Sequence, residues 1–283
     1  MTAERRGVLA IAGAALLWST GGIGIKTVAE PPLKIACWRS AFAAVALLAL
    51  FRPRVRLTAP FLAASASYAA CLTTFVVATK WTTAANAIFL QYSGVVWVLL
   101  LSPLVVDEPR RAHDAVAIGV ALAGMALFFA GRLELHAHAG DAVALLSGIF
   151  FAAVVLLLRR ERGGDAGAAA VAWGNVFTAL ALAPFVVRDA SIGARSLLIL
   201  ALLGTFQLAA AYVLFLRGIA HVAAAQASVV GMLEPVANPI WVFLLLGEVP
   251  NGFALAGGAI VLGAIAWRTL AVGAPAPAVV APD

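Results

Sequence analysis

About ten blocks of roughly twenty apolar residues fill this 283-residue chain, and they limit its possible folds more than any other feature. A helix needs about 20 apolar residues to cross a hydrocarbon core of ~30 Å. Only 11% of the residues are charged, against roughly 25% in a soluble domain. We therefore expect an all-α polytopic membrane protein embedded in a lipid bilayer. The predicted spans are residues 7–25, 33–51, 60–79, 83–106, 113–131, 140–158, 166–187, 196–216, 222–246 and 252–270.

The basic residues stand at the ends of these blocks, so the net charge of +6 indicates membrane orientation rather than binding of nucleic acid. A cytoplasmic N-terminus places most of them inside. We predict a multi-pass protein of a bacterial-type inner membrane, with both termini cytoplasmic. The inside set is Arg5, Arg6, Arg52, Arg54, Arg56, Arg110, Arg111, Arg159, Arg160, Arg162, Arg217 and Arg268. The outside set is Lys26, Lys34, Lys80, Arg132, Arg188 and Arg195.

The chain matches itself when it is displaced by about 140 residues. Residues 69–108 then lie over 209–248 without a gap, and Glu108 meets Glu248. The matched positions run in order at nearly one displacement, which Ala- and Leu-rich helices do not readily give by accident. The sequence therefore predicts two repeats of five spans each.

Five is an odd number, so the second repeat must enter the membrane from the face opposite to the first. Inverted repeats recur in secondary transporters, which bind substrate at the repeat interface near the midplane. We expect repeats at 1–135 and 136–270 around a central cavity. The Pro/Ala-rich residues 271–283 are expected to form a disordered tail.

Polar and aromatic side chains within the spans are the candidate substrate contacts, because such groups are costly in hydrocarbon and usually face the bundle interior. The set is Trp18, Thr20, Arg39, Thr74, Phe75, Thr79, Asn86, Gln91, Tyr92, Trp173, Gln207, Tyr212, Gln226, Glu234 and Asn238.

Each candidate also has a structural alternative. Threonine hydroxyls in membrane helices often bond back to the preceding turn or join two helices. The amides of Asn86 and Gln226 serve equally well as helix-to-helix contacts. Arg39 could reach the outer headgroups, and Glu234 could be a protonated acid bonded to a neighbouring helix. The sequence leaves these alternatives open.

Two ionisable residues are the strongest candidates for substrate recognition. Arg39 is expected to contact a carboxylate or to pair in a gate, and Glu234 to contact an ammonium group or to act as a proton-coupled switch. An aromatic-lined pocket with few polar groups suits an apolar or aromatic substrate. The aromatic side chains expected to stack on it are Trp18, Phe75, Tyr92, Trp173 and Tyr212.

Span nine contains two prolines, each of which removes a backbone donor and frees a carbonyl one turn back. Together with Gly231, these prolines, Pro235 and Pro239, predict a bent helix. Backbone groups freed at membrane depth must be buried in protein or line a cavity. We therefore expect Glu234 and Asn238 to face a hollow beside the bend.

Span four has no proline at the matching position, so a bend in one half only is expected. Glu108 and Glu248 each end a span and are expected to cap the N–H groups of the following helix.

No enzyme motif is present. The chain has no GxxxxGK[ST] loop, no glycine-rich dinucleotide fingerprint, no GxSxG and no HExxH. His136 and His138 precede Asp141 in a short loop without a thiolate, which is a poor metal site. We predict no catalytic residue, no metal and no cofactor.

The run Leu233-Glu234-Pro235, then Leu246-Gly247-Glu248, then Gly258 and Gly263 resembles the end of an EamA-type repeat of the drug/metabolite transporter superfamily. Arg39 falls where that family has an arginine in its second span. The resemblance covers nearly the whole chain and is strongest to the YddG-type exporters of aromatic and other neutral amino acids. It implies a basket of ten helices around a central cavity, with spans five and ten at the periphery. Gly119, Gly124, Gly257, Gly258 and Gly263 would suit close packing there.

We therefore expect a secondary transporter that exports aromatic and other neutral, apolar amino acids by alternating access, with protons as a candidate coupled ion. The alternatives are a multidrug or other small-metabolite carrier of the same superfamily, a channel-like facilitator, and an intramembrane enzyme or scaffold.

Overall fold

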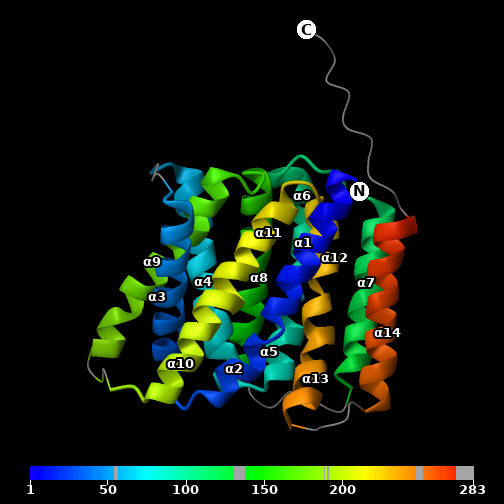
Figure 1. The fold of residues 1–283 in the computed structure, drawn as a ribbon. Coiled ribbons are helices and arrows are strands. Elements are labelled where there is room, and N and C mark those ends of the chain that lie inside the picture. The colour runs from blue at the N-terminus through cyan, green and yellow to red at the C-terminus, as the bar shows by residue number, and fades with distance from the viewer. Residues whose placement is uncertain (54–56, 131–137, 188, 190, 247–250, 272–283) are drawn as a thin grey trace.

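The structure, a computed structural model, describes residues 1–53, 57–130, 138–187, 189, 191–246 and 251–271. All regular elements in these ranges are helices (Figure 1). The first half of the chain forms α1 (Ala3–Trp18), α2 (Gly21–Thr27), α3 (Pro32–Phe51), α4 (Ala59–Trp81), α5 (Ala84–Gln91), α6 (Gly94–Val105) and α7 (Ala112–Phe128).

The second half begins with α8 (His138–Arg160) and ends with a π-helical segment, η2 (Trp267–Ala271). Between them lie α9 (Asp165–Val187), α10 (Ala194–Leu202), the π-helix η1 (Leu203–Ala210), α11 (Ala211–Ile219), α12 (Ala224–Gly231), α13 (Leu233–Leu246) and α14 (Gly252–Ala266).

Within the described residues these elements form ten passages that run alternately up and down the bundle (Figure 1). The α1/α2, α5/α6, α10/η1/α11, α12/α13 and α14/η2 segments each make one passage. Because each half makes five, α8 starts at the end of the bundle opposite to the start of α1. The predicted all-α polytopic fold with inverted halves is confirmed. We call the end at which α1 starts and η2 ends the termini side.

Eight helices or helix runs are long and apolar enough to cross a membrane, counted over the described residues. The fifth passage, Ala112–Phe128, is shorter than predicted. The ninth is divided into α12 and α13, neither of which spans a bilayer alone. The fifth and ninth passages both run alongside the other passages of the bundle. The prediction of ten spans therefore holds, although the fifth is shorter and the ninth is broken.

Breaks at matching positions divide the fourth passage of each half, so the expectation of a bend in one half only is wrong. In the second half, α12 ends at Gly231 and α13 begins at Leu233, which leaves Pro235 in a first turn where proline is tolerated. In the first half no proline is needed. The Ser93 hydroxyl donates to the Leu90 carbonyl at 2.6 Å, and short-range backbone bonds form a tight turn of the kind that often marks a hinge.

The two halves are packed into each other rather than side by side. α4 lies against α8 and α9, and α3 lies against α9 and η1. One buried apolar cluster contains residues from both halves, including Ile11, Tyr68, Phe151 and Tyr212. The centre of the bundle is therefore the interface between the repeats, where an inverted-repeat transporter places its site.

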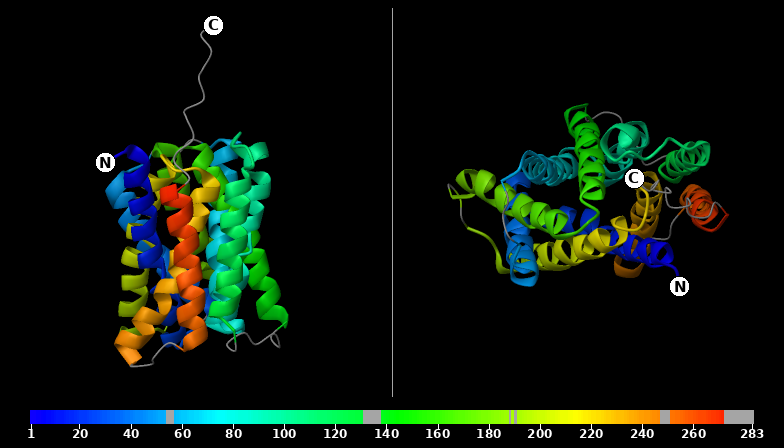
Figure 2. Two further views of the ribbon diagram at one scale, coloured as in Figure 1. Left: turned by 90° about the vertical axis from the view of Figure 1, so that its right-hand side faces the viewer. Right: turned by 90° about the horizontal axis from the view of Figure 1, so that it is seen from above.

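α7 and α14 pack on each other at one edge of the bundle (Figure 2). Gly124 and Gly257 make this contact close: a Cβ at Gly257 would lie 2.3 Å from the Phe128 nitrogen and 2.5 Å from the Gly124 carbonyl oxygen. Gly119 and Gly263 meet nothing within 4 Å. The expectation that all five glycines of these spans pack closely is therefore wrong for these two, which lie on other faces of their helices.

We expect Gly257→Ala to lower stability by about 1–3 kcal/mol, because the added methyl group meets backbone that cannot move aside. Gly263→Ala adds the same atoms to open space and removes glycine's entropic cost, so it should change stability by less than about 1 kcal/mol. Thermal unfolding of the purified protein in one detergent measures both. Equal melting temperatures for the two variants would contradict the packing described here.

Candidate functional site

A cavity of about 40 Å³ lies near the middle of the passages. It is lined by Trp18, Arg39, Cys71, Leu72, Phe75, Gln91, Phe151, Gln207, Leu208, Tyr212 and Glu234. These residues come from both halves and from eight helical elements: α1, α3, α4, α5, α8, η1, α11 and α13. Seven of the fifteen candidate residues from the sequence are among them: Trp18, Arg39, Phe75, Gln91, Gln207, Tyr212 and Glu234.

Arg39 reaches this cavity because α3 and η1 approach closely. A Cβ at Gly204 would lie 2.4 Å from the Arg39 carbonyl oxygen, so only glycine fits at this crossing. The π-helical turn of η1 places Gln207 on the cavity wall beside it. π-Helical segments inside α-helices are frequently found at functional sites.

Arg39 is 2% exposed, and no hydrogen bond or ion pair to its side chain occurs among the described residues. A buried guanidinium normally needs an acceptor or a counter-charge, because burying an unpaired charge is costly. Its interior position also argues against the alternative that it reaches the headgroups. Among the described residues, Arg39 is therefore a cation without a hydrogen-bond or ion-pair partner, and it faces a cavity.

Glu234 faces the same cavity from α13 and is 8% exposed. One oxygen, Oε2, lies 2.9 Å from the hydroxyl of Tyr92. The same hydroxyl lies 2.6 Å from the carbonyl oxygen of Gly231. Tyr92 therefore connects the carboxyl group to the break between α12 and α13. In the described part of the chain, Glu234 and Arg39 form no ion pair with each other.

Two amides complete the polar wall. Gln91, which lines the cavity, donates through its amide nitrogen to the Ser147 hydroxyl at 2.8 Å. Gln207 donates weakly to the Trp18 carbonyl at 3.4 Å, and its own side-chain oxygen has no partner among the described residues. Both amides hold acceptor capacity that a ligand with N–H groups would satisfy.

Aromatic rings form the apolar wall. Trp18 contacts Tyr212 with ring centroids 5.1 Å apart and Phe215 at 5.2 Å. Tyr212 also meets Tyr68 edge-to-face at 4.7 Å. Such arrangements are favourable for aromatic pairs. They hold Trp18 and Tyr212 rigidly beside the charged groups.

The three threonine candidates lie outside this cavity. Thr74 and Thr79 donate to carbonyls of their own helix α4 at 2.6 and 2.8 Å, and Thr20, at the break between α1 and α2, donates to the Leu17 carbonyl at 2.8 Å. These contacts are the bonds back to the preceding turn that the sequence allows as the structural alternative for threonine. Asn86 bonds to Asp141 at 3.0 Å and to Thr82 at 3.1 Å, so it joins α5 to the start of α8.

Four further candidates also lie away from the cavity. Asn238 does not face the hollow: it donates to the Ser19 carbonyl at 3.0 Å and so binds the break between α1 and α2. Gln226 is 1% exposed in α12. Trp173 packs against Phe177 and the apolar cluster. Tyr92 lies behind Glu234 rather than on the wall.

Four cavity residues were not singled out from the sequence: Cys71, Leu72, Phe151 and Leu208. Their apolar side chains resemble those of any membrane helix. One signal was available for two of them. Cys71 and Leu72 precede Phe75 by four and three residues, which places all three on one face of α4.

A cluster on the termini side joins both halves. Arg159, at the end of α8, donates to Glu108 at 2.7 Å and to the carbonyls of Ile219 and Ala220 at 2.8 and 3.0 Å. The other oxygen of Glu108 accepts from the Ala224 N–H at 2.8 Å. Glu108 thus caps a helix, but it caps α12 rather than the following helix α7. Its repeat partner Glu248 lies outside the described residues.

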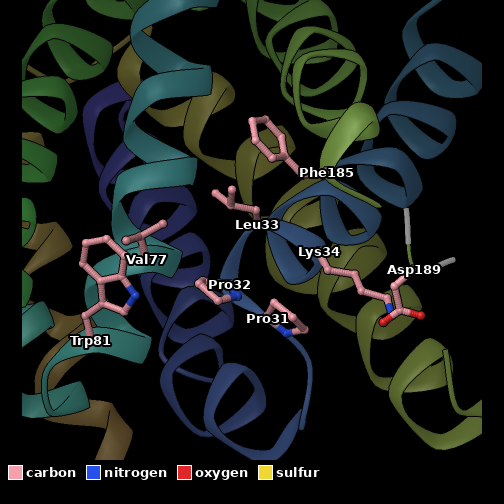
Figure 3. Close-up of a pocket in the computed structure, with 8 residues that line it drawn as sticks. All are labelled: Pro31, Pro32, Leu33, Lys34, Val77, Trp81, Phe185 and Asp189. Atoms are coloured by element: carbon pink, nitrogen blue, oxygen red, sulfur yellow. The ribbon is translucent and has the colours of Figure 1, made fainter. Parts of the chain in front are cut away.

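On the opposite side, a groove of about 450 Å³ opens between α3, α4 and α9. In Figure 3, Lys34 reaches toward Asp189 while Trp81 and Val77 stand across the groove. Lys34 already bonds to Glu30 at 3.0 Å, to Asp189 at 3.4 Å and to the Ser191 carbonyl. The Ser191 hydroxyl, together with the Lys34 ammonium, lowers the pKa of Asp189 from its usual range. The three contacts of Lys34 use the three N–H donors of its ammonium group, so Lys34 has none left for a ligand.

The central cavity has room for only about three water molecules. It therefore holds no amino acid in this conformation. What the arrangement offers is one unpaired cation and one carboxyl group, separated by a narrow space with aromatic walls.

The fold is that of a multi-pass membrane protein whose inverted halves enclose a central polar site. The sequence profile of the EamA-like transporter family matches residues 5–130 and again 138–270. The chain belongs to the EamA-like transporter family.

Two individual proteins resemble the chain, one in sequence and one in fold. An uncharacterized transporter of Archaeoglobus fulgidus is 26% identical over 267 residues, which are 93% of this chain and 97% of that protein. A protein of known crystal structure superposes with a TM-score of 0.80 over 95% of this chain and 98% of its own, at 19% identity. That second likeness concerns the fold alone.

Proposed function

We propose that this member of the family exports aromatic and other neutral, apolar amino acids across the inner membrane by alternating access. The single observation that carries the proposal is that the Arg39 guanidinium and the Glu234 carboxyl group both line the central cavity without pairing with each other. A guanidinium without a partner suits a carboxylate, with which it can form two parallel hydrogen bonds. A carboxyl group on another helix suits an ammonium group.

Size and wall chemistry support the same substrate class. The walls are aromatic, which suits an apolar or aromatic side chain. A phosphorylated substrate carries more negative charge than the one cation at mid-depth would neutralise. The cavity is too small for an amino acid, so the proposal requires the halves to separate around it when substrate binds. We refer to the conformation described here as closed.

Orientation is part of the proposal. The described members of the predicted inside set belong to element ends and loops on the termini side. Excess Arg and Lys marks the cytoplasmic side of a membrane protein. We therefore place both termini in the cytoplasm.

Counterflow in reconstituted vesicles tests the function. We expect vesicles loaded with unlabelled phenylalanine to take up labelled phenylalanine, with saturation. Phenylethylamine lacks the carboxylate and phenylpropionate lacks the ammonium group, so each should compete at least about tenfold less well, since the loss of one charged contact removes 1.4 kcal/mol or more.

Each alternative gives another result. Equal competition by the amine and by structurally unrelated drugs indicates a multidrug carrier. Flux that does not saturate indicates a channel-like facilitator. An enzyme or scaffold gives no counterflow with any compound, and that outcome overturns transport itself.

A further inference from the structure

The Tyr92 hydroxyl has one hydrogen but two acceptors in reach. Its oxygen lies 2.6 Å from the Gly231 carbonyl oxygen and 2.9 Å from Oε2 of Glu234. A phenol donates one hydrogen bond and can accept others. At one of these two contacts, therefore, Tyr92 must accept rather than donate.

The Gly231 carbonyl requires the hydrogen. In a continuous helix it would accept from the residue four positions on, which is Pro235, and proline has no N–H. This carbonyl is buried at mid-membrane, where an unsatisfied backbone group is costly. The shorter of the two contacts is also the one to Gly231.

A carboxylate has no hydrogen to donate, whereas a protonated carboxyl group has one. The geometry points to a protonated Glu234 in this closed conformation, with its proton donated to Tyr92. We propose that Glu234 is the proton-binding site of the transporter, and that one proton and one substrate ammonium compete for it. This coupling rests on the proposed amino-acid substrate, whereas the bound proton does not.

The other charges around Glu234 agree with this exchange. The titratable groups that face it in the described chain are Arg39 on α3, Cys71 on α4, Tyr212 on α11 and Tyr92 itself. With Glu234 neutral, Arg39 leaves the cavity one positive charge in excess, which attracts a carboxylate. When the ammonium of that substrate arrives, the O–H bond of Glu234 breaks, its proton leaves to water on the open side, and the carboxylate pairs with the ammonium.

Tyr92 conveys this change to the backbone. Once Glu234 is a carboxylate, it becomes the stronger acceptor, and the hydrogen of Tyr92 turns from Gly231 toward it. The Gly231 carbonyl, at the break between α12 and α13, then loses the one side-chain donor that it has among the described residues. The charge state of Glu234 and the angle of the broken passage are coupled through this one hydroxyl.

Infrared spectroscopy of the substrate-free protein tests the bound proton. At pH 7 we expect a carbonyl band of a protonated carboxylic acid that Glu234→Gln removes. Tyr92→Phe should keep the band and shift it, because the acid loses its acceptor. One control should leave it unchanged: Tyr68→Phe, which removes a buried hydroxyl that accepts from Asn175.

Proton release tests the competition. In weakly buffered detergent solution at pH 7, phenylalanine binding should release up to about one proton per molecule bound, as linkage requires when a ligand displaces a proton. Glu234→Gln should release none. Its amide can still donate to Tyr92, so this variant is expected to fold. It should bind phenylalanine more weakly, because the ammonium loses its carboxylate partner, and it should lose accumulation driven by a pH gradient.

The outcomes separate this inference from the proposed function. A wild-type spectrum without a band sensitive to Glu234→Gln overturns the bound proton, whatever the transport assay shows. A band without proton release overturns the competition. Counterflow that is absent while the band is present overturns the amino-acid function and leaves the proton site standing.

Discussion

Replacing Arg39 with glutamine should lower the apparent affinity for phenylalanine on the order of 100-fold, because truncating one partner of a desolvated charge pair costs about 2–5 kcal/mol. The reason is specific to this cavity. In the described residues no protein acceptor competes for the Arg39 guanidinium, so nothing in the site replaces it as the partner of a carboxylate. Arg39→Lys should be intermediate, since an ammonium keeps the charge but not the two-pronged geometry.

The matched substrate is phenylethylamine, which has no carboxylate. Its weak binding should be nearly the same in wild type and in Arg39→Gln, because the contact removed is one it never makes. Competition against labelled phenylalanine measures both ligands on one preparation. Thr178→Val is a protein control, since its hydroxyl bonds to Gly174 of its own helix at 2.8 Å, away from the cavity. A similar loss for both ligands would show that Arg39 supports the fold rather than the carboxylate.

The number of passages and their directions followed from apolar block length and from the positions of basic residues. Both features depend on how each segment interacts with the membrane, so they can be predicted without knowing which helices pack against one another. The mid-membrane position of Arg39 and Glu234 could be predicted on the same ground, because a charge at that depth is costly wherever the helix lies.

The breaks and the threonine contacts could not be predicted in this way. The first-half break needs the Ser93 hydroxyl and the fit of Gly94 against Gly148, where a Cβ would lie 2.4 Å from the carbonyl oxygen. That fit depends on a helix 54 positions away along the chain. Whether Thr74 faces a cavity or its own backbone depends on helix rotation, which an Ala- and Leu-rich sequence does not determine.

The contacts of Glu108 also could not be predicted in full from the sequence. Its position before Pro109 indicated a cap, and it is one, yet the helix it caps starts at Ala224 in the other half. Only the folding of one repeat into the other brings the α12 start beside it. The capping role of Glu108 could be predicted from the local sequence, whereas the identity of the helix that it caps depends on how the two halves pack.

This cross-half cluster leads to the second large effect: Arg159→Gln should open the termini side. The side chains of Arg159 and Glu108 are 21% and 20% exposed. Solvent therefore screens their electrostatic contacts only in part. A cation at the α11 C-terminus and a carboxylate at the α12 N-terminus each also favour the local helix dipole. Losing the charge-assisted contacts should favour the open state by roughly 1.5–3 kcal/mol, which is about 10- to 100-fold in population.

Cys71 reports this opening, because it lines the cavity and is 4% exposed in the closed state. In a Cys37→Ala background it is the one remaining thiol of the two in the chain. A membrane-impermeant maleimide added from the termini side should label it roughly tenfold faster or more in Arg159→Gln, in proportion to the population shift. Arg160→Gln is the matched control, an exposed neighbour on the same helix end.

Exchanging the two charges separates a simple salt bridge from the arrangement observed here. Glu108→Arg with Arg159→Glu keeps an opposite-charge pair in place. It also puts a cation at the N-terminus of α12 and a carboxylate at the C-terminus of α11, where both helix dipoles disfavour them. We therefore expect fast labelling of Cys71 to persist in the double variant. Labelling that returns to the wild-type rate would mean that the ion pair alone holds this side closed, and that capping of α11 and α12 contributes nothing.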